Sequence, residues 1–124
     1  MPGQFEYNNK FATAVTGNTN SPNGKSTGCG KQTVVTKFTA GSTPTVAVAI
    51  QGSFAGSPSG TDWVTLVCIK EGAAAETKAI SFTETTSGYF YYVISKGWYP
   101  YVRVNLSANT NMTMDEAWLL EQGA

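Results

Sequence analysis

The sequence has 124 residues, of which 41% are hydrophobic and only 13% are charged. Its eight basic and eight acidic side chains cancel, which disfavours nucleic acid and anionic membranes as partners because no broad field attracts them. A chain of this length is expected to form one domain, and its weakly charged surface suits a protein that works inside an assembly.

Residues 1–10 are polar and lack periodicity, so they are expected to form an extended N-terminal arm before a single domain over 11–124. Phe5 and Tyr7 are unusual in a free tail, since disordered segments carry few aromatic residues. They either pack on the edge of their own domain or dock on a neighbouring subunit. The start lacks a signal-like segment and no apolar run reaches membrane-spanning length, which predicts a soluble protein made in a cytosol.

Eight stretches alternate between apolar and polar residues, or are rich in β-branched and aromatic residues, as strands are. In chain order they are 11–16, 31–38, 45–52, 63–70, 77–83, 89–95, 99–108 and 112–121. The segment 63–70 is the most apolar and is expected to be a central strand covered on both faces. The segment 112–121 could instead contain a helix, but a strand is favoured because it would complete the sheet beside its hairpin partner.

Strands separated by turns, without a convincing helix, predict an all-β fold, an antiparallel β-sandwich. Eight strands favour a jelly roll in particular. An immunoglobulin-like sandwich is disfavoured, because Trp63 lies almost next to Cys68 instead of midway between two cysteines. Cys29 and Cys68 could form one bridge, but a reducing compartment favours two free thiols.

The sequence contains no histidine, which removes the commonest general base and the usual catalytic zinc ligand. Most carboxylates lie in predicted loops or at strand ends, and the adjacent Asp115 and Glu116 would point to opposite faces of a strand. The Gly-Lys-Ser triplet at 24–26 lacks the upstream glycine of a phosphate-binding loop. We therefore predict no enzyme activity, no cofactor and no metal site.

Aromatic residues gather between positions 89 and 101, and strand alternation must turn some of them outward. Exposed Tyr and Trp side chains anchor protein interfaces or stack on sugars. Arg103 lies on the outer side of its strand beside Tyr101, where it either clamps a carboxylate of a partner or is simply solvated. The candidate partner-binding residues are Phe5, Tyr7, Phe11, Trp98, Tyr99, Tyr101 and Arg103.

The succession AVAIQGSFAGSPSGTDWVTL, an aromatic strand, YPYVRVNLSA and a closing strand resembles small β-sandwich structural proteins of tailed bacteriophages. These include jelly-roll capsid decoration (cement) proteins and modules of fibres. The resemblance covers roughly residues 33–121 and rests on an "IQGS…G…DW" turn and a "YVRVN" strand. It brings no catalytic residues.

The resemblance implies a non-enzymatic virion protein on the capsid surface, bound to the major capsid protein and stabilising contacts between capsid subunits. It also implies self-association on the capsid, as a dimer or trimer. The alternative is a carbohydrate-binding module or a fibre-associated receptor-binding domain with a glycan as its ligand. Its stacking platform would be Trp63, Trp98, Tyr99 and Tyr101.

Overall fold

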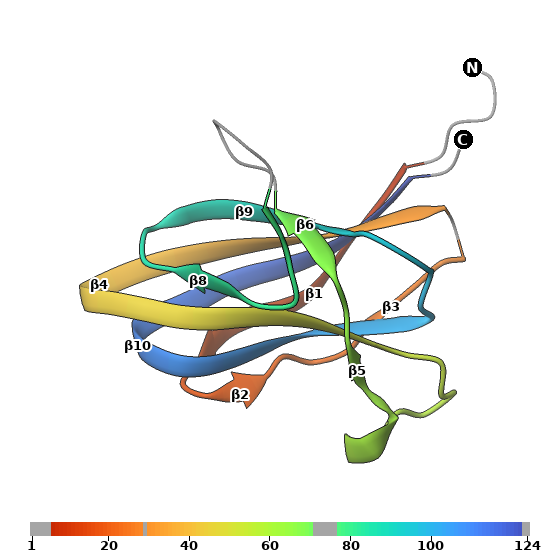
Figure 1. The fold of residues 1–124 in the computed structure, drawn as a ribbon, viewed down its shortest axis with the longest axis horizontal. Coiled ribbons are helices and arrows are strands. Elements are labelled where there is room, and N and C mark those ends of the chain that lie inside the picture. The colour runs from red at the N-terminus through yellow and green to blue at the C-terminus, as the bar shows by residue number, and fades with distance from the viewer. Residues whose placement is uncertain (1–5, 29, 71–76, 123–124) are drawn as a thin grey trace.

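The computed structural model describes residues 6–28, 30–70 and 77–122, and this part of the chain is built from antiparallel strands (Figure 1). In chain order the elements are β1 (Glu6–Thr16), β2 (Thr19–Asn20), β3 (Gly24–Lys25), β4 (Lys31–Ser53), the short 3-10 turn η1 (Gly60–Asp62), β5 (Val64–Thr65), β6 (Cys68–Lys70), β7 (Thr77–Ala79), β8 (Phe82–Glu84), β9 (Gly88–Ile94) and β10 (Tyr101–Gln122). The predicted all-β, antiparallel class is confirmed.

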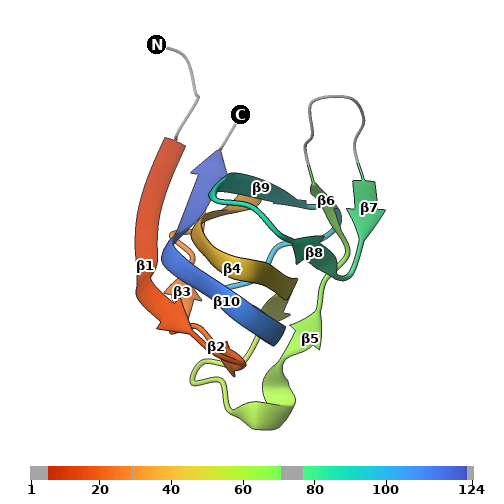
Figure 2. The ribbon, with the colours of Figure 1, turned by 90° about the vertical axis from the view of Figure 1, so that its left-hand side faces the viewer.

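Two long strands, β4 and β10, form the backbone of the fold. They pair antiparallel over their whole length, from Tyr101 opposite Ser53 to Gln122 opposite Lys31. Both bend midway, so the sheet folds over and its two halves face each other, as Figures 1 and 2 show. One layer contains β1, β9, β6 and β7 together with the first half of β4 and the second half of β10. The other layer contains β2, β3, β5 and β8 together with the second half of β4 and the first half of β10.

The core lies between these layers because one parity of each long strand is apolar. On β4 the buried side chains include Val34 and Phe38 before the bend and Val48 and Ile50 after it. Burial of each such side chain contributes about 1.5–3 kcal/mol. The ring of Phe82 on β8 lies 5.1 Å from that of Tyr92 on β9, so the aromatic packing also joins the two layers.

The bend depends on residues that accept a left-handed backbone conformation. Thr43 on β4 has φ +42°, and Ala108 and Asn111 on β10 have φ +48° and +54°. The pairing register also shifts on both sides of Thr110. Each long strand was predicted as two strands separated by a turn, and the structure shows that pairing continues around each corner.

The predicted count of eight strands is wrong because the long strands continue through their corners, and also because the segment 63–70 is not one central strand. It divides into β5 on one layer and β6 on the other, joined where the chain crosses between them at Leu66. Val64 is 52% exposed and Val67 is 40% exposed. The apolar run therefore belongs to a segment that crosses between the layers and leaves some of its apolar side chains at the surface. The ten strands found in the described residues form one folded-over sheet.

The predicted arm is corrected where the structure describes it. Residues 6–10 belong to β1 and pair with Trp118–Gln122, because β10 offers them a free edge. Phe5 lies outside the described residues, and for Tyr7 only the backbone position in β1 is described. The remainder of the proposed arm therefore stays a prediction.

The segment 112–121 is a strand, as favoured, but its facing differs from the simple alternation. Met112 and Met114 are buried, and a register irregularity between Met114 and Glu116 then shifts burial to Ala117 and Leu119. Such a bulge inserts one residue and turns all later side chains to the opposite face. Trp118 would share a face with Met112 and Met114 in an unbroken alternation, but because of the bulge it lies on the outer face.

Asn109 closes the corner of β10. Its side-chain Nδ2 donates to the carbonyls of Gly17 and Met112, both at 3.0 Å, and its Oδ1 accepts from the Met112 amide at 3.1 Å. Asn109→Ala is expected to lower the free energy of unfolding by about 1–3 kcal/mol because these partners lose their hydrogen bonds. Urea unfolding measures this difference, with Thr110→Ala as the exposed control. Equal stability of the two variants would show that the corner does not depend on this side chain.

Candidate functional site

The predicted binding residues whose side chains the structure describes fall into separate regions of the molecule. Phe11 lies at the edge where β1 meets β3, partly buried against the core. A Cβ atom on Gly24 would lie 2.7 Å from the ring of Phe11, so only glycine leaves room for this ring. Phe11 thus packs against the core at one edge of the sandwich.

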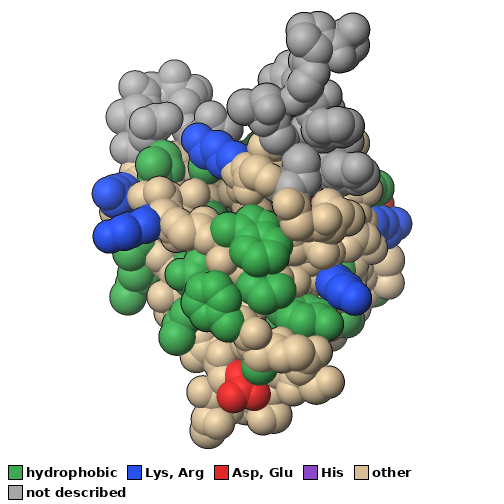
Figure 3. Space-filling model, turned by 90° about the vertical axis from the view of Figure 1, so that its right-hand side faces the viewer, with side chains coloured by type: hydrophobic (Ala, Val, Ile, Leu, Met, Phe, Trp, Pro, Cys, Tyr) green, Lys and Arg blue, Asp and Glu red, His purple; other side chains and the backbone are tan. Residues whose placement is uncertain are grey.

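Tyr99 lies in the loop before β10, beside β5, and the exposed Trp98 precedes it in the same loop. The phenyl ring of Phe54 lies 4.9 Å from that of Tyr99, and Phe54 is 71% exposed. A hollow of about 370 Å³ next to Tyr99 is bordered by Val64 and Val67. We call these five residues, Phe54, Val64, Val67, Trp98 and Tyr99, the apolar end patch. Figure 3 shows hydrophobic side chains gathered across this end.

Tyr99 is held in place by contacts on two sides. Its ring lies directly on Gly52, where an added Cβ would come within 2.6 Å of the ring. Its backbone is bound by the side-chain amide of Gln32, which donates to the Tyr99 carbonyl at 2.8 Å and accepts from the Tyr99 amide at 3.0 Å. The apolar end patch therefore sits on a preformed support.

Glu121 completes that support from β10. Its buried carboxylate accepts hydrogen bonds from the Thr27 amide at 2.7 Å, the Thr27 hydroxyl at 2.8 Å and Gln32 Nε2 at 3.3 Å, and also from the Ser26 hydroxyl. Burial acts to raise the pKa of Glu121, but the hydrogen bonds outweigh it and lower the pKa below its usual value. One carboxylate thus ties the polar loop at 26–28 to the strand ends.

Arg103 and Tyr101 lie elsewhere, on the outer face of the layer that contains β5. The Arg103 guanidinium stacks on the ring of Trp63, with its central carbon 4.3 Å from the ring centroid, and its Nε donates to Gln51 Oε1 at 2.7 Å. Partial burial lowers the pKa of Arg103. The structure therefore brings Arg103 together with Trp63, and separately brings Tyr99 together with Phe54.

A second aromatic surface lies on the outer face of the other layer; its tyrosines belong to the aromatic cluster expected between 89 and 101, but none of its residues was among the candidate partner-binding residues. Tyr89 and Tyr91 on β9 are 54% and 42% exposed. Together with Val35, Trp118 and Leu120 they line a groove of about 400 Å³ that also reaches Asn8 and Glu116. We call this the aromatic groove. The adjacent acids at 115 and 116 could have indicated the bulge that creates it, since unbroken alternation would bury one of them.

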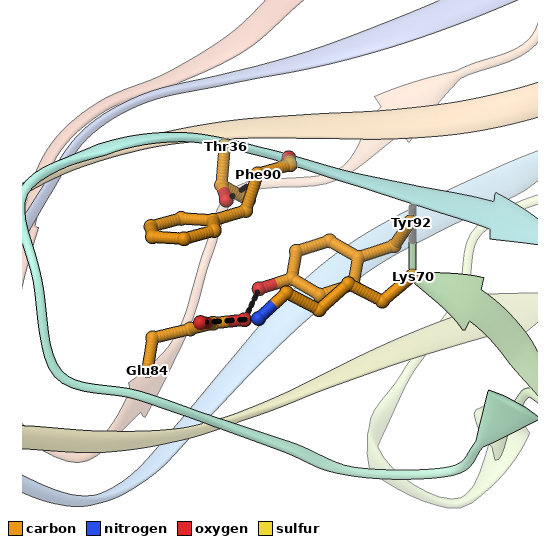
Figure 4. Close-up of polar contacts among 5 residues, drawn as sticks. All are labelled: Thr36, Lys70, Glu84, Phe90 and Tyr92. Atoms are coloured by element: carbon orange, nitrogen blue, oxygen red, sulfur yellow. Dashed lines mark hydrogen bonds and ion pairs between the residues drawn. The ribbon is translucent and has the colours of Figure 1, made fainter. Parts of the chain in front are cut away.

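The described carboxylates are engaged in structural contacts. Figure 4 shows Glu84, which is 3% exposed, accepting from the Tyr92 hydroxyl at 2.6 Å and from Lys70 Nζ at 2.7 Å. Burial, followed by the hydrogen bond to Glu84, raises the pKa of Tyr92. Asp115 accepts from the Thr39 hydroxyl at 2.6 Å, and Asp62 from the Ser59 amide at 2.8 Å.

No group of three or more potential metal-ligating residues occurs within 6–28, 30–70 and 77–122. Cys68 is buried, which raises the pKa of its thiol to about 12. Cys29 lies outside the described residues, so the state of the two thiols stays a prediction. No helix of the described chain is long and apolar enough to span a membrane.

The class defined by this geometry is a two-layered antiparallel β-sandwich folded around one bent pair of long strands. It is similar to the crystal structure of the SPBc2 prophage-derived protein YomS, with a TM-score of 0.68. The match covers 97% of this chain and 95% of that chain at 12% sequence identity. No protein-family model and no curated protein matches the sequence. At this identity the similarity establishes the fold.

The contacts of Glu121 predict a pH-dependent stability. A pKa lowered by folding stabilises the protein fully above the unfolded-state pKa, and this contribution is lost as the pH falls through the folded-state pKa. Glu121→Gln is therefore expected to cost about 1–3 kcal/mol at neutral pH, and less on acidification. Denaturant unfolding of both proteins between neutral and acidic pH measures the gap. A gap that stays constant across this range would contradict the assignment.

Proposed function

We propose that this chain is a non-enzymatic structural protein of a phage particle that attaches to the outer capsid surface as a decoration or cement protein. The observation that carries this proposal is the apolar end patch, on a fold shared with a prophage-derived protein. The sequence resemblance to capsid decoration proteins supports the same assignment.

The end patch has the properties of a protein-binding surface. Exposed apolar side chains that cluster, instead of being scattered singly, mark interaction sites. Trp98 and Tyr99 belong to the residue types that dominate binding energy at interfaces. Because Gln32 and Gly52 already fix Tyr99, little conformational entropy is lost when a partner covers the patch.

In this proposal the patch binds the major capsid protein at seams between subunits. Many copies on one particle, associated as dimers or trimers, make individually weak contacts strong through multivalency. The low charge of the chain supports close packing of such copies, since little repulsion opposes it. The protein is then found on the virion after synthesis in the host cytoplasm.

The test is cosedimentation of purified protein with capsids stripped of it, together with the heat resistance of the particles. Wild-type protein is expected to bind at saturating stoichiometry and to raise that resistance. Phe54→Ser and Trp98→Ala are expected to weaken binding about tenfold or more, as interface anchors do. Tyr89→Ala, which removes an exposed ring outside the apolar end patch, serves as the control.

Three results would contradict the proposal. They are failure of the wild-type protein to bind, binding of only a few copies per particle, and binding that Phe54→Ser and Trp98→Ala leave unchanged. Circular dichroism and thermal unfolding establish that each variant is folded before its binding is compared.

A further inference from the structure

The aromatic groove is built by strand register on the outer face of the layer that contains β9. Tyr91 on β9 pairs with Val35 on β4, and Val35 pairs with Trp118 on β10. These three residues therefore form one row across three neighbouring strands. Figure 2 shows the same three strands.

The row has large rings at its ends and a small side chain in the middle. Adjacent strands lie about 4.8 Å apart, so the backbones bearing Tyr91 and Trp118 are separated by roughly 10 Å. Val35, between them, is only 5% exposed and forms the floor. Tyr89 lies two residues before Tyr91 and extends the same wall along β9. The result is a trough with aromatic walls.

Polar groups rim this trough and fix the Trp118 wall. The indole Nε1 of Trp118 donates to Glu116 Oε1 at 3.1 Å, and Lys10 Nζ lies 3.5 Å from Glu116 Oε2. Lys10 Nζ also lies 5.8 Å from the Trp118 ring centroid. The hydrogen bond from Trp118, followed by smaller effects that include the charge of Lys10, lowers the pKa of Glu116. The ring is thus held in place by its polar neighbours.

The charged side chains around the groove already interact with neighbouring side chains. Glu116 faces Lys10, and Lys37 Nζ lies 5.6 Å from the ring centroid of Tyr89. A ligand with a strong net charge would have to compete with these contacts. An uncharged ligand with apolar faces and a hydroxyl edge meets rings on its faces and hydrogen-bonding groups at its edge.

Pyranose sugars have this character, since their C–H faces pack on aromatic rings while their hydroxyls accept and donate hydrogen bonds. The volume of about 400 Å³ lies in the range of small-ligand sites. We infer that the aromatic groove binds a neutral, pyranose-based oligosaccharide, with Tyr91 and Trp118 as its stacking walls and Asn8 and Glu116 at its hydroxyl rim. This inference is independent of attachment to a capsid.

The test measures binding of cellohexaose, maltohexaose and chitohexaose to the full chain by isothermal titration calorimetry and by tryptophan fluorescence. Binding of at least one of them is expected. Tyr91→Ala should weaken it about threefold to tenfold, the range expected for loss of one aromatic contact. Trp118→Ala should weaken it at least as much. Because Trp118 is half-buried, the exposed Tyr91 keeps the test decisive if the Trp118 variant fails to fold.

Trp98→Ala is the matched control and should leave sugar binding unchanged, because Trp98 belongs to the apolar end patch. Absence of binding to all three sugars at millimolar concentration would overturn the inference. So would binding that Tyr91→Ala leaves intact. A dimer that Tyr91→Ala disrupts, without any bound sugar, would overturn it too and assign the groove to a second copy of the chain. Loss of capsid binding in Trp98→Ala tests only the proposed function.

Discussion

The structure depends on the pairing of β4 with β10 and on the corner that both strands turn together. Because the ladder continues around the corner, the same two strands supply the centre of both layers. The shorter strands add to the edges of this frame. The corner requires left-handed backbone at three non-glycine residues, each of which costs about 1–2 kcal/mol, and the side chains of Asn109 and Asn111 bind the carbonyls that the turn exposes. The apolar core compensates for this strain.

Buried polar groups specify where the loops lie against the frame. Gln32 and Glu121 are almost fully buried, yet their side-chain atoms are all hydrogen-bonded to the loop at 26–28 and to Tyr99. Glu84 has the same relation to Tyr92 and Lys70. A satisfied buried network rigidifies a structure because breaking one bond leaves an unpaired group in a medium of low polarity. In this protein the network fixes the backbone of Tyr99, which belongs to the apolar end patch.

The two exposed aromatic surfaces lie at different places and have different character. The apolar end patch is an exposed cluster with few polar groups, which suits contact with another protein. The aromatic groove is rimmed by amide and charged groups, which suits a small hydroxyl-bearing ligand. A structural protein with both surfaces would attach to a particle through the apolar end patch and bind a glycan in the aromatic groove. The fold is compatible with this division because the strand frame keeps the two surfaces apart.

The sequence by itself determined the all-β class and the antiparallel sandwich, because alternation is a local property that burial of one face imposes. It also predicted that some aromatic residues between 89 and 101 face outward, and the structure shows Trp98 to be 38% exposed. Only the tertiary structure decided that the long strands continue through their corners and that Trp118 turns outward. Both depend on which strands pair and where a bulge interrupts the ladder, and these are long-range interactions that no local pattern specifies.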